Sequence, residues 1–157
     1  MTPGFEYSEI GTWLGDLPDD PVASIGQDSD PAARFNFVVR GDPVDVNVIG
    51  PDSNGPLVIT STVTFPEEVL SVVRTRPDRF FRETSAIMAS TPGYHQFTDR
   101  EGNPADAGSF SALHLRHHVY PDGGDKHTVL TGVIDLLTSA EHLHDAGKRL
   151  VNAAGEP

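Results

Sequence analysis

Residues 35–65 have the sequence FNFVVRGDPVDVNVIGPDSNGPLVITSTVTF, and this stretch decides the fold class. Phe35–Arg40, Val44–Val48 and Leu57–Phe65 show the two-residue alternation that is typical of a strand with one buried face. Short runs of Gly, Pro and Asp separate the three segments and favour turns. Because strands that are joined by short turns pair antiparallel, we predict a three-stranded meander. We expect five of its side chains to face a common core: Phe35, Phe37, Val46, Ile59 and Val63.

Helices are predicted on both sides of this meander. From Phe5 to Leu17, apolar residues recur at three- and four-residue spacing, which predicts a short helix. A polar loop over 26–31 follows it. Pro66 and two acidic residues begin a second helix, which extends to Ser90 and which Pro77 interrupts. Residues 93–108 show no period, and we expect an irregular segment there.

The C-terminal part is expected to add a hairpin and a last helix. Ser111–Tyr120 alternates like a fourth strand, and Asp122–Asp125 has turn composition. His127–Leu136 is apolar on both faces in places, so we predict a fifth strand in the centre of the sheet. Thr138 has capping-box spacing for a helix that ends near Ala154. The predicted class is α+β, in the order α-β-β-β-α-β-β-α with a five-stranded antiparallel sheet, as a single domain over 1–157 with an ordered core over about 5–154.

The composition excludes several classes of function. The 157 residues carry a formal net charge of −12 and no cysteine, so disulfides and thiolate metal sites are ruled out. Binding to duplex nucleic acid needs clustered Lys and Arg, which are sparse here. No apolar run reaches the roughly 20 residues of a membrane span, and no secretory signal is visible, so we expect a cytoplasmic protein. Asp outnumbers Glu and only two lysines occur, Lys126 and Lys148, which favours a salt-adapted cytoplasm over ordinary acidity.

No catalytic motif is visible. Glycine-rich phosphate loops and a serine nucleophile elbow are both missing from the sequence. The histidines are the best candidates for chemistry, and His114, His118 and His127 form a weak candidate metal site if a hairpin brings His127 to the other two. The simpler interpretation is a polar sheet face with scattered surface histidines. We therefore predict no cofactor and favour a non-enzymatic protein.

The succession of elements, carried by the 35–65 meander, the 66–90 helix and the 113–136 hairpin, resembles the type III secretion chaperone-like fold, which includes YbjN-type proteins and uncharacterised archaeal families. That resemblance implies a homodimer that binds protein segments, with a protein partner or a second copy as its ligand. The partner surface is predicted on the middle helix: Arg76, Arg79, Phe80, Phe81 and Met88. The alternatives are a small-ligand binder, with its site between the sheet and the kinked helix, and a histidine-dependent metal-binding protein or enzyme.

Overall fold

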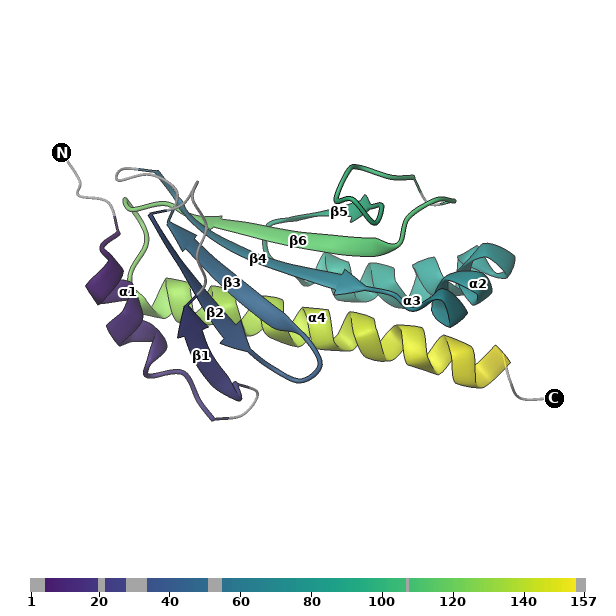
Figure 1. Cartoon of the computed structure of the whole chain (residues 1–157), viewed down its shortest axis with the longest axis horizontal. Coiled ribbons are helices and arrows are strands. Elements are labelled where there is room, and N and C mark those ends of the chain that lie inside the picture. Colours follow the sequence, from purple (N-terminus) through teal and green to yellow (C-terminus); the bar gives the residue numbers. More distant parts are fainter. Residues whose placement is uncertain (1–4, 20–21, 28–33, 51–54, 107, 155–157) are drawn as a thin grey trace.

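The computed structural model describes residues 5–19, 22–27, 34–50, 55–106 and 108–154, and over these residues the protein is a mixed α+β structure (Figure 1). Its strands form one antiparallel sheet in the order β1-β2-β3-β4-β6-β5. The strands are β1 (Ser24–Gln27), β2 (Phe35–Arg40), β3 (Asp45–Gly50), β4 (Leu57–Thr64), β5 (Tyr94–Thr98) and β6 (Ala112–Val119). The helices are α1 (Tyr7–Leu14), α2 (Glu67–Thr75), α3 (Pro77–Ala89) and α4 (Lys126–Ala154).

The predicted meander is confirmed as β2, β3 and β4. Phe37 pairs with Val48 and Val48 with Ile59, all in antiparallel register. The five side chains that we expected in a common core all belong to the main buried cluster. Alternation of apolar and polar residues therefore sufficed to identify both the strands and their buried face.

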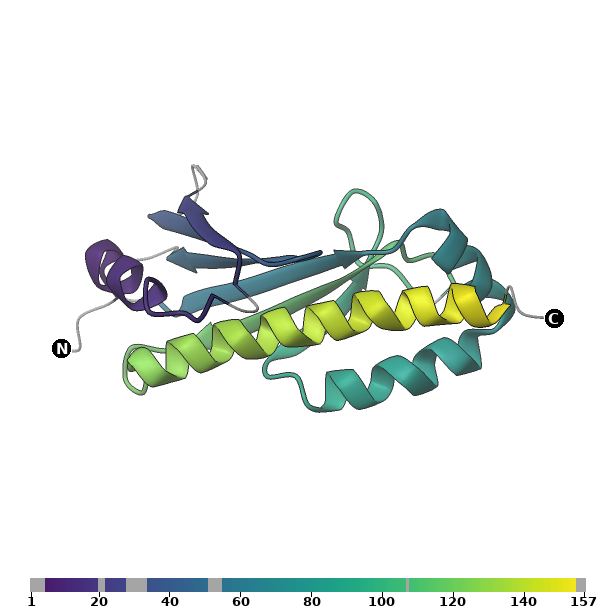
Figure 2. The same cartoon turned by 90° about the horizontal axis from the view of Figure 1, so that it is seen from below.

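Helices cover one face of the sheet, which we call the inner face. Figure 2 shows α4 running along the sheet, with α3 beside its C-terminal half and α1 at the opposite end. Close packing of α4 on the sheet depends on Gly132, where a β-carbon would lie 3.1 Å from the side chains of Ile59 and His117. The helical segment breaks between α2 and α3 at Arg76, directly before Pro77, as the proline predicts.

An aromatic cluster fills the space between α3 and the sheet. Phe80 is fully buried and contacts Phe65 edge-on, at 5.5 Å between ring centroids, and Phe110 in a stacked arrangement at 5.7 Å. Phe97 lies 4.5 Å from Phe110 and also meets Phe81. These rings join α3 to β5, to the end of β4 and to the segment before β6 in a single core.

The predicted fifth strand is wrong, because residues 127–136 belong to the 29-residue helix α4. Asp125, which was assigned to a hairpin turn, accepts hydrogen bonds at Oδ1 from the backbone amide and hydroxyl of Thr128, both at 2.8 Å. This is the geometry of a helix N-cap. The buried residues of α4 recur mainly at four- and three-residue spacing, so the apolar residues that suggested a central strand form one helical face. The buried apolar residues of α4 are Val129, Val133, Leu136, Leu137, Ala140, Leu143, Ala146 and Leu150.

Two strands were not predicted, so the sheet has six strands over the described residues rather than five. β1 begins before the expected polar loop and includes its first two residues, Gly26 and Gln27, while residues 28–31 fall outside the described part of the protein. β5 lies in the segment that we expected to be irregular. Gly93 directs the backbone into β5, because its φ is +82° and a β-carbon there would collide with the carbonyl oxygen of Arg116.

Candidate binding groove on the outer face

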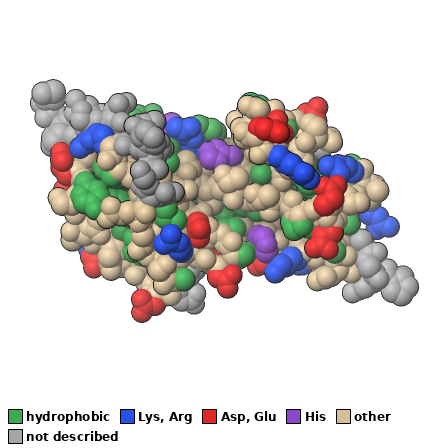
Figure 3. Space-filling view, viewed as in Figure 1, with side chains coloured by type: hydrophobic (Ala, Val, Ile, Leu, Met, Phe, Trp, Pro, Cys, Tyr) green, Lys and Arg blue, Asp and Glu red, His purple; other side chains and the backbone are tan. Residues whose placement is uncertain are grey.

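The second face of the sheet, which we call the outer face, is covered by no helix of the described part of the protein (Figures 1 and 2). The alternation along β4 and β6 places Ile59, Val63 and Leu115 inward and directs Thr62 and His114 outward. Figure 3 shows the outer face: charged side chains gather over α2 and the β5–β6 loop, while uncharged surface dominates the middle strands. A polar, uncovered face is the usual solvent side of an antiparallel sheet, and a hollow on it is open to a ligand.

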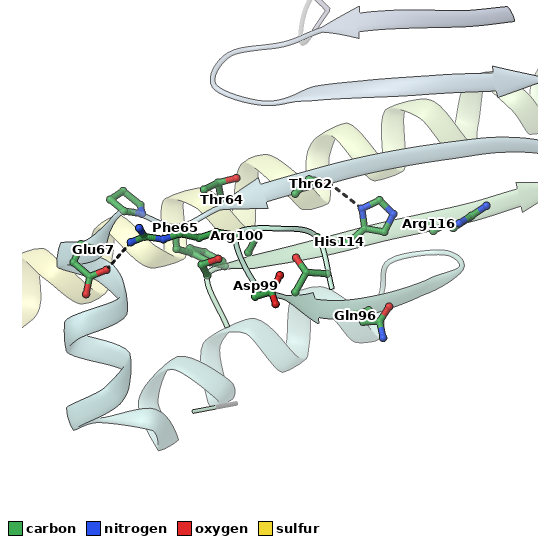
Figure 4. A pocket seen from close by; sticks show the side chains of 14 residues that line it. Thr62, Thr64, Phe65, Glu67, Gln96, Asp99, Arg100, His114 and Arg116 are labelled. Carbon is green, nitrogen blue, oxygen red and sulfur yellow. Dashed lines mark hydrogen bonds and ion pairs between the residues drawn. The ribbon is translucent and has the colours of Figure 1, made fainter. Parts of the chain in front are cut away.

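A hollow of about 720 Å³ lies on the outer face beneath the β5–β6 loop (Figure 4). Two rows of side chains form its floor, and each row runs across β4, β6 and β5. The rows come from two consecutive outward-facing positions on each strand. The rows are Thr62, His114 and Gln96, and Thr64, Ala112 and Thr98. Hydroxyl, amide and imidazole groups therefore line the floor and can donate or accept hydrogen bonds.

The turn at 99–103 forms one wall of this hollow. The Asp99 carboxylate accepts hydrogen bonds from the backbone amides of Glu101 and Asn103, both at 2.9 Å. Beyond the turn, the Ala105 amide donates to the carbonyl oxygen of Phe97 at 2.9 Å, which ties the loop to the edge of β5. At the rim, Arg100 lies 3.5 Å from Glu67, which is also paired with Arg74 at 2.8 Å. The wall is thus held by its own hydrogen bonds and ion pairs.

His114 and Thr62 form a hydrogen-bonded pair on the floor, with 2.9 Å between Nδ1 and Oγ1 (Figure 4). Burial, and then the neighbouring Arg116 guanidinium, lowers the pKa of His114, so its imidazole is neutral at neutral pH. In hydroxyl–imidazole catalytic sites a third group usually orients the imidazole base. Among the described residues, no hydrogen bond joins His114 to a carboxylate. The pair can donate or accept hydrogen bonds on the floor of the hollow.

Arg116 lies at the end of the hollow and extends along β6 away from His114 (Figure 4). Its Nε–H donates to Nε2 of His118 at 3.1 Å. Burial, followed by the charges of Arg116 and His117, lowers the pKa of His118, so the ring stays neutral and can accept this bond. Tyr94 and Tyr120 meet the His118 ring edge-on at 6.0 and 6.3 Å between centroids.

A second hollow, of about 370 Å³, adjoins the first and shares Thr62 and Thr64 with it. The pairing of β3 with β4 ends at Asn47 and Thr60, whereas β4 continues to Thr64. The second hollow lies where β3 leaves β4, and its lining includes the two shared threonines, Asp45 and His144 of α4. We call the two adjoining hollows the outer groove.

The three histidines that were weak candidates for a metal site do not come together. His114 and His118 share the outer face, but His127 is an exposed residue in the first turn of α4, which packs on the inner face. The expectation failed because it required a hairpin that does not form. No group of three or more His, Asp or Glu residues within the described ranges is arranged to hold a metal ion.

The residues predicted to bind a partner are divided by the structure. Arg76 and Arg79 are exposed, whereas Phe81 and Met88 are partly buried against the core. Phe80 has no exposed surface, so it belongs to the core and cannot contact a partner. A surface on α3 that includes the other four residues stays a prediction, as does the homodimer.

The residues of β5 and its loop, among them Tyr94, Gln96 and Arg100, were not predicted as site residues. The segment is short, and its alternation is interrupted by neighbouring polar residues, so no period was visible. Gly93 and Gly102, both with positive φ, were the available signals for the turns at its two ends.

Comparison with known proteins shows a fold but no family. No family model matches the sequence, and no curated protein matches it. A crystal structure of an uncharacterized protein from Methanothermobacter thermautotrophicus is similar over 90% of this chain and 96% of that chain, with a TM-score of 0.68 and 14% sequence identity. No helix of the described residues is long and apolar enough to cross a membrane. At this identity the likeness concerns the fold alone, an antiparallel sheet packed against helices in an α+β protein.

Proposed function

We propose that this protein is a non-enzymatic binding protein that holds an extended segment of a partner protein in the outer groove. One observation carries the proposal. Two adjoining hollows share Thr62 and Thr64: the larger lies on the sheet face that no described helix covers, and the smaller lies where β3 leaves β4, with His144 of α4 in its lining. An open groove lined largely by polar side chains suits a peptide better than a small molecule, whose sites are usually more enclosed and more apolar.

The free part of β4 supports an extended ligand. The Phe65 amide donates to the carbonyl oxygen of Ser111 on the β6 side, at 3.0 Å. Since backbone groups alternate in direction along a strand, those of Thr62 and Thr64 face the opposite side. The β3–β4 pairing has already ended there. An added strand can pair with these groups and place its side chains in the hollows.

This proposal keeps the protein-binding role expected from the sequence but moves the partner site from α3 to the outer groove. A small ligand in the larger hollow is the alternative, supported by its volume of about 720 Å³. A homodimer is compatible with the outer groove, since a dimer contact through α3 leaves the opposite face of the sheet uncovered.

Selection from a displayed library of random extended peptides tests the proposal. We expect peptides that bind the wild-type protein and lose at least about tenfold in affinity to Thr62→Trp, because the indole would fill the floor of the groove. Thr131→Trp is the matched control, since Thr131 is exposed on α4, away from the groove. Affinity is measured by calorimetry after circular dichroism shows that both variants are folded.

Two results would contradict the proposal. One is a selection that enriches no peptide above background. The other is a set of enriched peptides whose affinity is unchanged by Thr62→Trp but reduced by Arg79→Gln, which would return the partner site to α3.

A further inference from the structure

The geometry points to Arg116 as the residue that binds a carboxylate of the partner segment, so that the outer groove selects acidic segments. This inference rests on the proposed function and specifies its ligand. The carboxylate would lie over the guanidinium at the end of the larger hollow, beside Tyr94 and Tyr120.

Arg116 is a half-buried cation without an acidic partner among the described residues. No described Asp or Glu oxygen lies within 4.0 Å of its guanidinium, and its one described hydrogen bond is the 3.1 Å bond from Nε to His118. That bond uses one of the five N–H donors of the side chain and leaves the two terminal nitrogens for a ligand. A partly desolvated charge without a counterion is unfavourable, and a bound anion would relieve this cost.

The other charges around the larger hollow are already compensated. Glu67 is paired with both Arg74 and Arg100, and the Asp99 carboxylate is held by two amides of its own turn. Among the described lining residues, Arg116 is therefore the cation that remains available to an incoming group.

The surroundings of Arg116 favour an interaction with protein. Tyr94 and Tyr120 are 50% and 60% exposed and flank His118, the ring that orients the guanidinium. Tyr and Arg are enriched among residues that dominate binding energy at protein interfaces. His118 acts as a positioning residue here, because its neutral Nε2 accepts the hydrogen bond that directs Arg116 along β6.

The ligand that fits is a single carboxylate, from an Asp or Glu side group or from the C-terminus of a peptide. A guanidinium binds a carboxylate through two parallel hydrogen bonds. A polyanion such as a nucleic acid needs several cations and would be repelled by the formal charge of −12. Arg116 supplies one available positive charge at this end of the hollow, so it is suited to a ligand group that carries one negative charge.

The test uses the peptides selected on the wild-type protein. We expect them to require an Asp, a Glu or a free C-terminus. Replacing Asp by Asn, replacing Glu by Gln and amidating the C-terminus remove these carboxylates one at a time. Removal of the carboxylate that Arg116 binds should weaken binding about tenfold. Arg116→Gln should cause the same loss, with no further loss for the neutral peptide. Arg149→Gln removes the same charge from α4 and should leave affinity unchanged.

NMR supplies a second measurement that does not depend on a folded Arg116 variant. The Arg116 Nε–H resonance should shift in a saturable way with the acidic peptide and much less with the neutral one. If neutral and acidic peptides bind equally while Thr62→Trp abolishes both, the inference is wrong and the proposed function stands. If no peptide is enriched in the selection, both are wrong.

Discussion

In β4 and β6, the inner face differs from the outer face more than one strand differs from the other. On the inner face, Ile59, Val63 and Leu115 have no exposed surface and belong to the buried core, and α4 packs on these two strands. On the outer face, one residue away along the same strands, Thr62 and His114 form a hydrogen bond beside an open hollow. Stability and binding are therefore assigned to opposite faces of the same segments, and substitutions should separate the two.

The largest effect is expected for Phe80, on the inner side. Phe80→Ala should lower the free energy of unfolding by about 3–5 kcal/mol, because the ring is fully buried among Phe65, Phe81 and Phe110. Thr62→Ala, on the outer face, should cost less than about 1 kcal/mol. Urea unfolding measures both. Similar losses for the two variants would remove the distinction between the faces.

The next largest effect is expected at the N-terminus of α4. Asp125→Ala should lower the melting temperature by about 2–4 °C, because the variant loses the N-cap of α4. Asp125→Asn is the control, since asparagine also caps helices. The Thr128 amide lowers the pKa of Asp125. The stabilisation from the cap is therefore complete above the ordinary carboxyl pKa, and it is lost as pH falls from there through the lower pKa of the folded state. An unchanged melting temperature for the alanine variant would show that α4 does not depend on this cap.

A smaller change tests whether 127–136 is helical. Thr131 is exposed in α4, and Thr131→Ala should raise the free energy of unfolding by about 0.5 kcal/mol because alanine is the better helix former. In a strand the same substitution would be destabilising, since threonine is favoured there. The sign of the change in denaturant midpoint therefore distinguishes the helix from the predicted strand.

The smallest effect concerns the pH dependence of the inner-face histidine. Burial lowers the pKa of His117, against the opposing charge of Asp135, where the ring meets Gly132. A lowered pKa means that the unfolded protein binds the proton first, so stability is complete above about pH 6.5 and declines as pH falls toward the folded-state value. His117→Gln should therefore reduce the loss of melting temperature between about pH 7 and pH 5. His114→Gln offers the same comparison on the outer face, and a steeper loss in either variant would contradict the sign.

How far the sequence predicted the structure depended on how local the deciding signal was. The meander over 35–65 was predicted correctly because alternation and turn residues act within a few positions. The stretch 127–136 was assigned wrongly, since β-branched residues favour strands while their four- and three-residue spacing favours a helix. Only continuation of that spacing through Leu143 and Leu150 resolves the conflict. The outer groove was not predicted, because it depends on the pairing of β5 with β6. Local sequence patterns do not indicate which strands pair.

The sequence by itself determined an antiparallel meander with a defined buried face, a helix broken before Pro77 and a protein without a visible catalytic motif. Tertiary structure alone decided that β5 lies beside β6, that α4 covers the inner face and that His127 lies apart from His114. It also decided that Arg116 is oriented by His118 at the end of the outer groove. The physical reason is that alternation and proline restrict the backbone locally, whereas a site on a sheet face depends on which strands become neighbours. That choice is made by the packing of the whole core.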